Sequence, residues 1–199
     1  MRIVVTGGTG FIGRALCERL LQEEHTLTVV TRTPRTSANP RMRFVEWQPG
    51  TPGPWETVLA ESDAVINLAG ESIVAKRWAD QQKRAIVDSR VGTTRALVEA
   101  ISRAAHKPAV LVNASAVGYY GPRGDAYLHE HDTPGTDFLA QLCQRWEEAA
   151  QSAEWLGVRV VRLRIGLVLA PDGGALAKML PAFRAGLGGP LGSGRQWMS

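Results

Sequence analysis

The sequence predicts an α/β fold, a doubly wound parallel sheet with helices on both faces. A short apolar, β-branched run at the N-terminus leads through a glycine-rich turn into a stretch with helical spacing. Apolar runs and helical patterns then alternate along the chain, which is typical of parallel strands joined by helical crossovers. The expected strands are residues 3–5, 27–31, 43–47, 64–68, 109–113 and 158–164. The expected helices begin near residue 11 and cover residues 55–60, 80–104, 137–147 and 172–183.

The first thirteen residues favour a nucleotide-binding turn. The run 3–5 suits a strand buried on both faces, and helical spacing begins at Phe11. Between them, Gly7 allows a tight bend, Gly10 lets the backbone approach a pyrophosphate, and Gly13 lets the helix lie close to the strand. The free N–H groups and the positive end of the helix dipole would face the phosphates. A glycine turn that binds nothing is the alternative.

The segment Thr-Gly-Gly-Thr-Gly-Phe-Ile-Gly at 6–13 resembles the opening of the extended short-chain dehydrogenases/reductases, the family of nucleotide-sugar epimerases and dehydratases. The resemblance implies a Rossmann domain that binds a nicotinamide dinucleotide, here residues 1–171. In the family, the segments that match 67–70 and 164–171 lie against the cofactor's ribose, pyrophosphate and nicotinamide. The cofactor-binding residues that these motifs imply are Thr6, Gly7, Gly10, Phe11, Ile12, Gly13, Leu68, Ala69, Gly70 and Arg164.

The end of the second expected strand favours NADP(H) over NAD(H). An acidic residue at this place would bind the ribose 2′-hydroxyl of NAD. The sequence instead has Thr31, Arg32 and Arg35, with no carboxylate among them. Guanidinium groups hold a 2′-phosphate well. We therefore add these three residues to the cofactor site; a solvated arginine loop is the alternative.

Composition narrows the class of protein. The chain has 199 residues, 44% of them hydrophobic and 21% charged, with a net charge of +4. No apolar run is long enough to cross a membrane, and no signal peptide fits before the first strand, so we expect a cytoplasmic protein without a membrane partner. The positive charge is spread rather than arranged in a stripe with aromatics, which argues against nucleic acid. Cys17 and Cys143 lack metal-type spacing, so two buried free thiols and no metal site are expected.

The catalytic groups depart from the family. Residues 114–121 resemble the family's serine-rich segment ending in Val-Tyr-Gly, where a serine hydroxyl bonds the reacting oxygen of the substrate, and Ser115 is the matching hydroxyl. The family's Tyr-x-x-x-Lys acid/base pair on the next helix is missing, since Leu139 and Cys143 stand at its positions. We therefore expect Ser115, with Tyr119 or Tyr120, to carry the chemistry.

Other readings stay open. The base could come from Glu71, Glu130 or His131, or the protein could bind NADP(H) without turnover, as a sensor or regulatory protein. In the stretch 89–94, which resembles the family's Asn-x-x-Gly-Thr, Ser89 replaces the asparagine.

Three further segments, Asn-Leu-Ala-Gly-Glu, Ala-Val-Gly-Tyr-Tyr-Gly and Trp-Glu-x-Ala, resemble an atypical "epimerase family" sub-branch. The resemblance implies an NADP(H)-dependent oxidoreductase or nucleotide-sugar epimerase-like enzyme that transfers hydride. Its substrate would be a small molecule, a nucleotide sugar or another carbonyl compound, and a homodimer is one assembly left open. Residues 172–199 are expected to begin a substrate-side segment that continues in relatives, so the chain resembles a fragment.

Overall fold

The computed structural model describes residues 1–73, 76–190, 192–195 and 197. Six parallel strands form one sheet in the order β3-β2-β1-β4-β5-β6. This order reverses direction between β1 and β4, which is the arrangement of a Rossmann fold. The predicted fold class is confirmed. The strands are β1 (Arg2–Thr6), β2 (Thr26–Thr31), β3 (Met42–Glu46), β4 (Ala64–Asn67), β5 (Val110–Ala116) and β6 (Arg159–Ile165).

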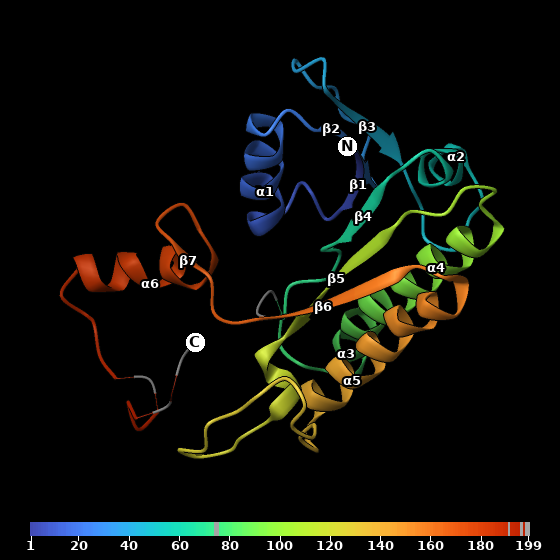
Figure 1. Ribbon diagram of the computed structural model, residues 1–199. Helices are drawn as coiled ribbons and strands as arrows, with labels where there is room; N and C mark the ends of the chain where they lie inside the picture. The colour runs from blue at the N-terminus through green and yellow to red at the C-terminus, as the bar shows by residue number, and fades with distance from the viewer. Residues whose placement is uncertain (74–75, 191, 196, 198–199) are drawn as a thin grey trace.

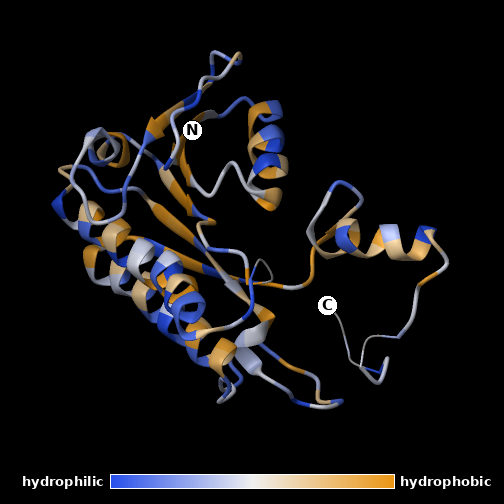
Figure 2. Cartoon of the chain, turned by 180° about the vertical axis from the view of Figure 1, so that it is seen from behind, coloured by the Kyte–Doolittle hydropathy of each residue, from blue (hydrophilic) through white to orange (hydrophobic). Residues whose placement is uncertain are grey.

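Helices cover the two faces of the sheet unequally (Figure 1). On one face, α1 (Phe11–Gln22) packs on a core that includes Val5 and Val29. On the other face, a larger core joins three helices to the strands. These helices are α2 (Pro54–Ala60), α4 (Thr93–Arg103) and α5 (Phe138–Gln151). Figure 2 shows the resulting pattern, with apolar strands between helices whose outer faces are polar.

The stretch expected as one helix over 80–104 has a wide turn in its middle. It consists of α3 (Asp80–Val87), a π-helical turn (Asp88–Gly92) and α4. Apolar spacing alone does not reveal the extra residue of a π turn, and such turns are frequent at functional sites. This one carries Ser89 and Arg90 toward the end of β4.

The last elements extend away from the sheet (Figure 1). After β6, the short strand β7 (Leu169–Ala170) pairs with Gly173 and Gly174, and α6 (Gly174–Arg184) follows. No residue of α6 is buried. Two single-turn 3-10 helices, Val117–Tyr120 and Ser152–Leu156, complete the described elements. Across the described parts of the chain, every helix is too short or too polar to span a bilayer.

Candidate nucleotide site and the polar network beside it

The glycine turn after β1 is built so closely that side chains are excluded at two positions. Gly7 has a φ of +69°, and a Cβ placed on it would lie 2.4 Å from the carbonyl oxygen of Leu68. A Cβ on Gly13 would lie 2.2 Å from the carbonyl oxygen of Gly7. These contacts match the bend and the close helix packing expected from the sequence.

Gly10 occupies the open side of the same turn. It is exposed, and a Cβ on it would meet only the Gly7 carbonyl oxygen, at 3.1 Å. No side chain caps the first turn of α1, and that turn contains no acidic residue. Its N–H groups are therefore available to an anion. The cradle fits the pyrophosphate of a dinucleotide.

A buried hydrogen-bond network fixes the strand ends behind this turn. The hydroxyl of Thr6 donates to Oδ1 of Asn67 at 2.5 Å, and Nδ2 of Asn67 donates to Oδ1 of Asn113 at 2.6 Å and to Oγ1 of Thr94 at 2.8 Å. Trp146 donates its indole N–H to the same Thr94 oxygen. Thr6, expected to bind cofactor, thus has a side chain that is wholly buried and joins β1 to β4.

The loop after β4 is held by the π-helical turn. The backbone N–H of Glu71 donates to Oγ of Ser89 at 2.9 Å, and Nη1 of Arg90 donates to the Glu71 carbonyl oxygen at 2.9 Å. Ser89, at the family's asparagine position, therefore positions this loop. The expected cofactor segment from Leu68 to Gly70 is partly to fully exposed.

The arginines near β2 differ in whether their side chains contact other side chains of the described protein. Arg41 pairs with Glu24 at 3.2 Å, and Arg43 donates to Thr28. Arg32 and Arg35 are exposed, and within the described part of the chain neither side chain has an ion pair or hydrogen bond. These are the two arginines that the sequence assigned to a 2′-phosphate. Thr31, just before them, accepts a hydrogen bond from the N–H of Thr33.

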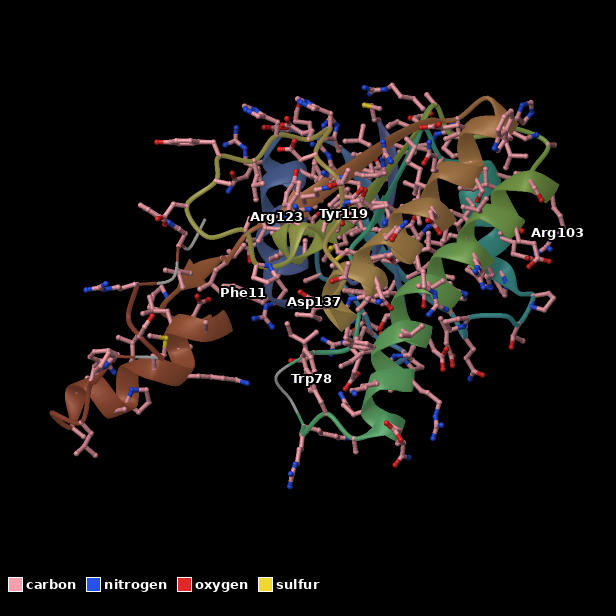
Figure 3. All side chains as sticks on the ribbon, turned by 90° about the horizontal axis from the view of Figure 1, so that it is seen from below. Phe11, Trp78, Arg103, Tyr119, Arg123 and Asp137 are labelled. Atoms are coloured by element: carbon pink, nitrogen blue, oxygen red, sulfur yellow. The ribbon has the colours of Figure 1, made fainter. Side chains whose placement is uncertain are left out.

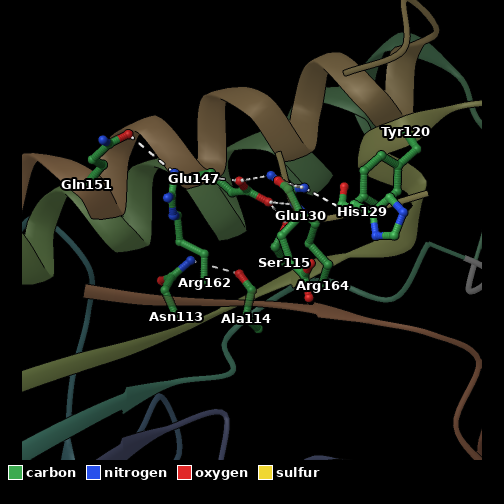
Figure 4. A network of polar contacts seen from close by, with 10 residues as sticks. All are labelled: Asn113, Ala114, Ser115, Tyr120, His129, Glu130, Glu147, Gln151, Arg162 and Arg164. Atoms are coloured by element: carbon green, nitrogen blue, oxygen red, sulfur yellow. Dashed lines mark hydrogen bonds and ion pairs between the residues drawn. The ribbon is translucent and has the colours of Figure 1, made fainter. Parts of the chain in front are cut away.

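Ser115 is tied to a carboxylate that the sequence analysis did not single out (Figure 4). Its hydroxyl donates to Oε1 of Glu147 at 2.6 Å. Arg164 donates to both oxygens of that carboxylate, from Nε at 2.9 Å and from Nη2 at 3.0 Å. Ser115 and Glu147 are each 3% exposed. The segment Trp-Glu-x-Ala was recognised in the sequence, but its glutamate shows its role only once β5, β6 and α5 are placed together.

Arg164 also organises the two tyrosines. Its Nη1 donates to the hydroxyl of Tyr120 and to the carbonyl oxygen of Glu130, each at 2.8 Å. The Tyr120 hydroxyl in turn donates to the carbonyl oxygen of His129. The Glu147 carboxylate raises the pKa of the Arg164 guanidinium, so this arginine is always charged. The cofactor contact expected for Arg164 stays a prediction. The ion pair of Arg164 with Glu147 was not indicated by the sequence.

Tyr119 differs from the other two hydroxyl groups. Its ring lies against the guanidinium of Arg164, with Cζ 3.5 Å from the ring centroid. Within the described residues its hydroxyl makes no hydrogen bond, whereas Ser115 and Tyr120 both donate to protein oxygens. Tyr119 is partly exposed.

Cys143 lies next to Ser115 at the position of the family's lysine. Burial raises the pKa of its thiol, although contacts with the Ala116 backbone and with Ser115 lower it in part. The thiol is therefore neutral at physiological pH. Both Cys143 and Cys17 are buried and free, as expected. Of the other candidate bases, Glu130 and His131 lie exposed in the loop after Tyr120, where His131 stacks on His129.

The segment after β6 returns to the glycine turn. A Cβ on Gly173 would lie 2.3 Å from the ring of Phe11, so the chain passes directly over that side chain (Figure 3). A groove of about 330 Å³ lies beside this contact. Its lining includes Phe11, Ile12, Arg14, Val168, Ala170 and Asp172. Phe11 and Ile12, both expected to contact cofactor, thus face a hollow.

The chain is similar to known proteins over nearly its whole length. A model of the NAD dependent epimerase/dehydratase family matches residues 3–198. The "Epimerase family protein SSP1921" of Staphylococcus saprophyticus is 45% identical over 198 residues, which are 98% of this chain and 65% of that protein.

Two solved structures superpose over the whole chain with a TM-score of 0.82 each. The human epimerase family protein SDR39U1 (isoform 2), determined with NADPH, is 36% identical, and this chain covers 64% of it. The nucleoside-diphosphate sugar epimerase from Corynebacterium glutamicum is 35% identical, and this chain covers 40% of it. The chain thus spans less than two thirds of the length of these relatives. By the match of nearly all its residues, the chain belongs to the NAD-dependent epimerase/dehydratase family.

Proposed function

We propose that the protein is an NADP(H)-dependent oxidoreductase or epimerase-like enzyme. The observation that carries this proposal is an open phosphate cradle at Gly10 together with two exposed arginines after the adjacent strand. These arginines, Arg32 and Arg35, have no side-chain partner among the described residues. A pyrophosphate suits the cradle and a 2′-phosphate suits the arginines. The NADPH in the structure of human SDR39U1 supports the same cofactor.

When bound, the nicotinamide would supply hydride transfer at its C4 atom. The chain's own residues would bind and orient it. The turn from Gly7 to Gly13 would hold the pyrophosphate, the segment from Leu68 to Gly70 would lie beneath the ribose, and Phe11 and Ile12 would border the groove that admits the ligand. Thr6 would act indirectly, by fixing the end of β1 through Asn67.

We propose Tyr119 as the first candidate for proton transfer to the substrate. Its hydroxyl makes no hydrogen bond to the described residues, whereas the Ser115 and Tyr120 hydroxyls donate to protein oxygens at 2.6 Å and 3.0 Å. The stacked guanidinium of Arg164 would hold the Tyr119 ring in place. Ser115 and Tyr120 stay candidates because substrate binding could exchange their partners. Glu71 is the next group if all three fail.

For the substrate, we propose a nucleotide sugar or another carbonyl compound, on the basis of family membership and of the relative named as a nucleoside-diphosphate sugar epimerase. We propose a cytoplasmic setting because the two buried cysteines are free thiols, as is usual in a reducing compartment. Residues 172–199 would begin the substrate-side part of the protein.

Hydride transfer from NADPH to a panel of carbonyl compounds and nucleotide sugars tests the proposal, using the protein at its full natural length. We expect turnover that Tyr119→Phe lowers by about 100-fold, the usual size of an acid/base contribution. Ser115→Ala and Tyr120→Phe are measured alongside, with melting temperatures to separate folding from chemistry. If NADPH binds tightly and no compound is reduced, the result favours the alternative, a non-catalytic NADP(H)-binding sensor or regulatory protein.

A further inference from the structure

Arg90, in the π-helical turn, is a fixed cation at the ligand-facing edge of the sheet. Its Nη1 donates to the carbonyl oxygens of Glu71, at 2.9 Å, and Ile86, at 3.3 Å. Its Cζ lies 5.3 Å from the centre of the Trp146 ring. These contacts come from β4's exit loop, from α3 and from α5, so the guanidinium is held in position before any ligand arrives.

Among the described residues, the Arg90 guanidinium has no close negative partner. The side chain is half-buried, and desolvation lowers its pKa, which is the opposite of the effect at Arg164. No carboxylate of the described residues lies within 4 Å of it, and the Glu71 carboxylate acts on it only from farther away. Cys143 is near, but its pKa is raised, so the thiol carries no compensating charge at neutral pH. Partial burial of a cation without an opposite charge costs free energy, and an anionic ligand bound beside the guanidinium would offset that cost.

The unused donors of Arg90 lie beside an exposed glycine. A Cβ on Gly70 would be 3.1 Å from Nη2 and 3.3 Å from Nε, so the guanidinium rests against the bare backbone of this residue. Within the described residues, neither Nε nor Nη2 has a hydrogen-bond acceptor. These two nitrogens form the edge of an arginine that binds two oxygens of a carboxylate or phosphate at once.

We propose that Arg90 binds an anionic oxygen group at the carboxyl end of β4. The group is either the pyrophosphate of the cofactor or a carboxylate or phosphate on the substrate, since both offer paired oxygens. The inference rests on the proposed nucleotide site, because that places a ligand against Gly70. Arg90 also brings a positive charge close to Cys143, where the sequence lacks the family's lysine.

Nuclear magnetic resonance of the arginine Nε–H group tests the contact without relying on activity. The Arg90 signal is the one that disappears in Arg90→Lys. We expect it to shift saturably when inorganic phosphate or malonate is added to the wild-type protein. A signal that moves with neither anion nor with NADPH overturns the proposal. The shift itself is measured on the wild-type protein, and Arg90→Lys serves only to assign the signal.

Calorimetric titration of NADPH identifies the source of the anion. If the pyrophosphate is the partner, Arg90→Met weakens NADPH binding by about 10- to 100-fold, and bound NADPH abolishes the phosphate-induced shift. If the substrate is the partner, NADPH affinity changes less than about threefold and the shift persists with NADPH bound. Arg84→Met, an exposed arginine on α3, is the matched control and should leave both readouts unchanged. If wild-type protein fails to bind NADPH but the Arg90 signal shifts with phosphate, the proposed function is wrong and the Arg90 site stands.

Discussion

The hydroxyl of Ser115 donates a 2.6 Å hydrogen bond to Oε1 of Glu147, and both side chains are buried. Arg164 completes the unit from the neighbouring strand by binding both carboxylate oxygens. The serine at the end of β5 is thus attached to α5 and β6 at once. Its proton is directed at the carboxylate, and the alignment of these three elements beside the candidate site depends on this contact.

Removing the carboxylate should destabilise the fold. Glu147→Ala leaves a largely buried guanidinium and a buried hydroxyl without their partner, and breaking such a pair costs about 3–5 kcal/mol. Urea denaturation measures the loss. Glu23→Ala, which removes the exposed i,i+4 pair with Arg19, is the control and should cost less than about 1 kcal/mol. Equal losses in the free energy of unfolding would show that the buried Glu147–Arg164 pair stabilises the fold no more than the exposed Glu23–Arg19 pair does.

Substitutions at Gly10 and Gly13 should have different effects, the first on cofactor affinity and the second on the stability of the fold. In Gly13→Ala the new methyl group would meet the Gly7 carbonyl carbon and oxygen, so the melting temperature should fall strongly. In Gly10→Ala the methyl group would meet only the Gly7 carbonyl oxygen, at 3.1 Å, so the melting temperature should fall much less than in Gly13→Ala while NADPH affinity drops. Thermal unfolding measures the melting temperature of each variant, and calorimetric titration measures its affinity for NADPH. If Gly10→Ala binds NADPH normally, the phosphate does not lie where we place it.

Cys17 should make stability fall at alkaline pH. Burial raises the pKa of its thiol from 9.0 to about 11, with a smaller contribution from Glu18. Between these values the unfolded chain loses the proton and the native protein keeps it, so the stabilisation is complete below pH 9 and is lost as pH rises toward 11. Urea denaturation at pH 7.5, 9 and 10.5 should show the stability difference between wild type and Cys17→Ala shrinking as pH increases. A constant difference would mean that the thiol titrates alike in both states.

The sequence was sufficient for the fold and for the glycine turn because both depend on local patterns. Strand-like runs of three to seven residues marked every strand of the sheet, and the spacing of Gly7, Gly10 and Gly13 indicated the turn. Strand ends differed by a few residues, most at β5, which continues through Ser115 to Ala116.

The polar network and the Arg90 site could not be predicted in this way. Glu147 meets Ser115 across 32 residues and Arg164 across 17, and only the pairing of β5 with β6 under α5 brings them together. Arg90 falls within the helix expected over residues 80–104, and the π turn that redirects its side chain leaves no trace in apolar spacing. Charged residues that act through long-range packing are visible only in three dimensions.

The preference for NADPH over NADH tests the central claim most directly. The dissociation constants of both cofactors are measured for the wild-type protein, for the double variant Arg32→Ala/Arg35→Ala, and for Arg41→Ala, whose arginine is already paired with Glu24. We predict that wild type binds NADPH at least tenfold more tightly, that the double variant loses this preference by weakening NADPH alone, about 10- to 100-fold, and that Arg41→Ala keeps it. Equal affinities of the wild-type protein for the two cofactors, or an unchanged preference in the double variant, would contradict the account.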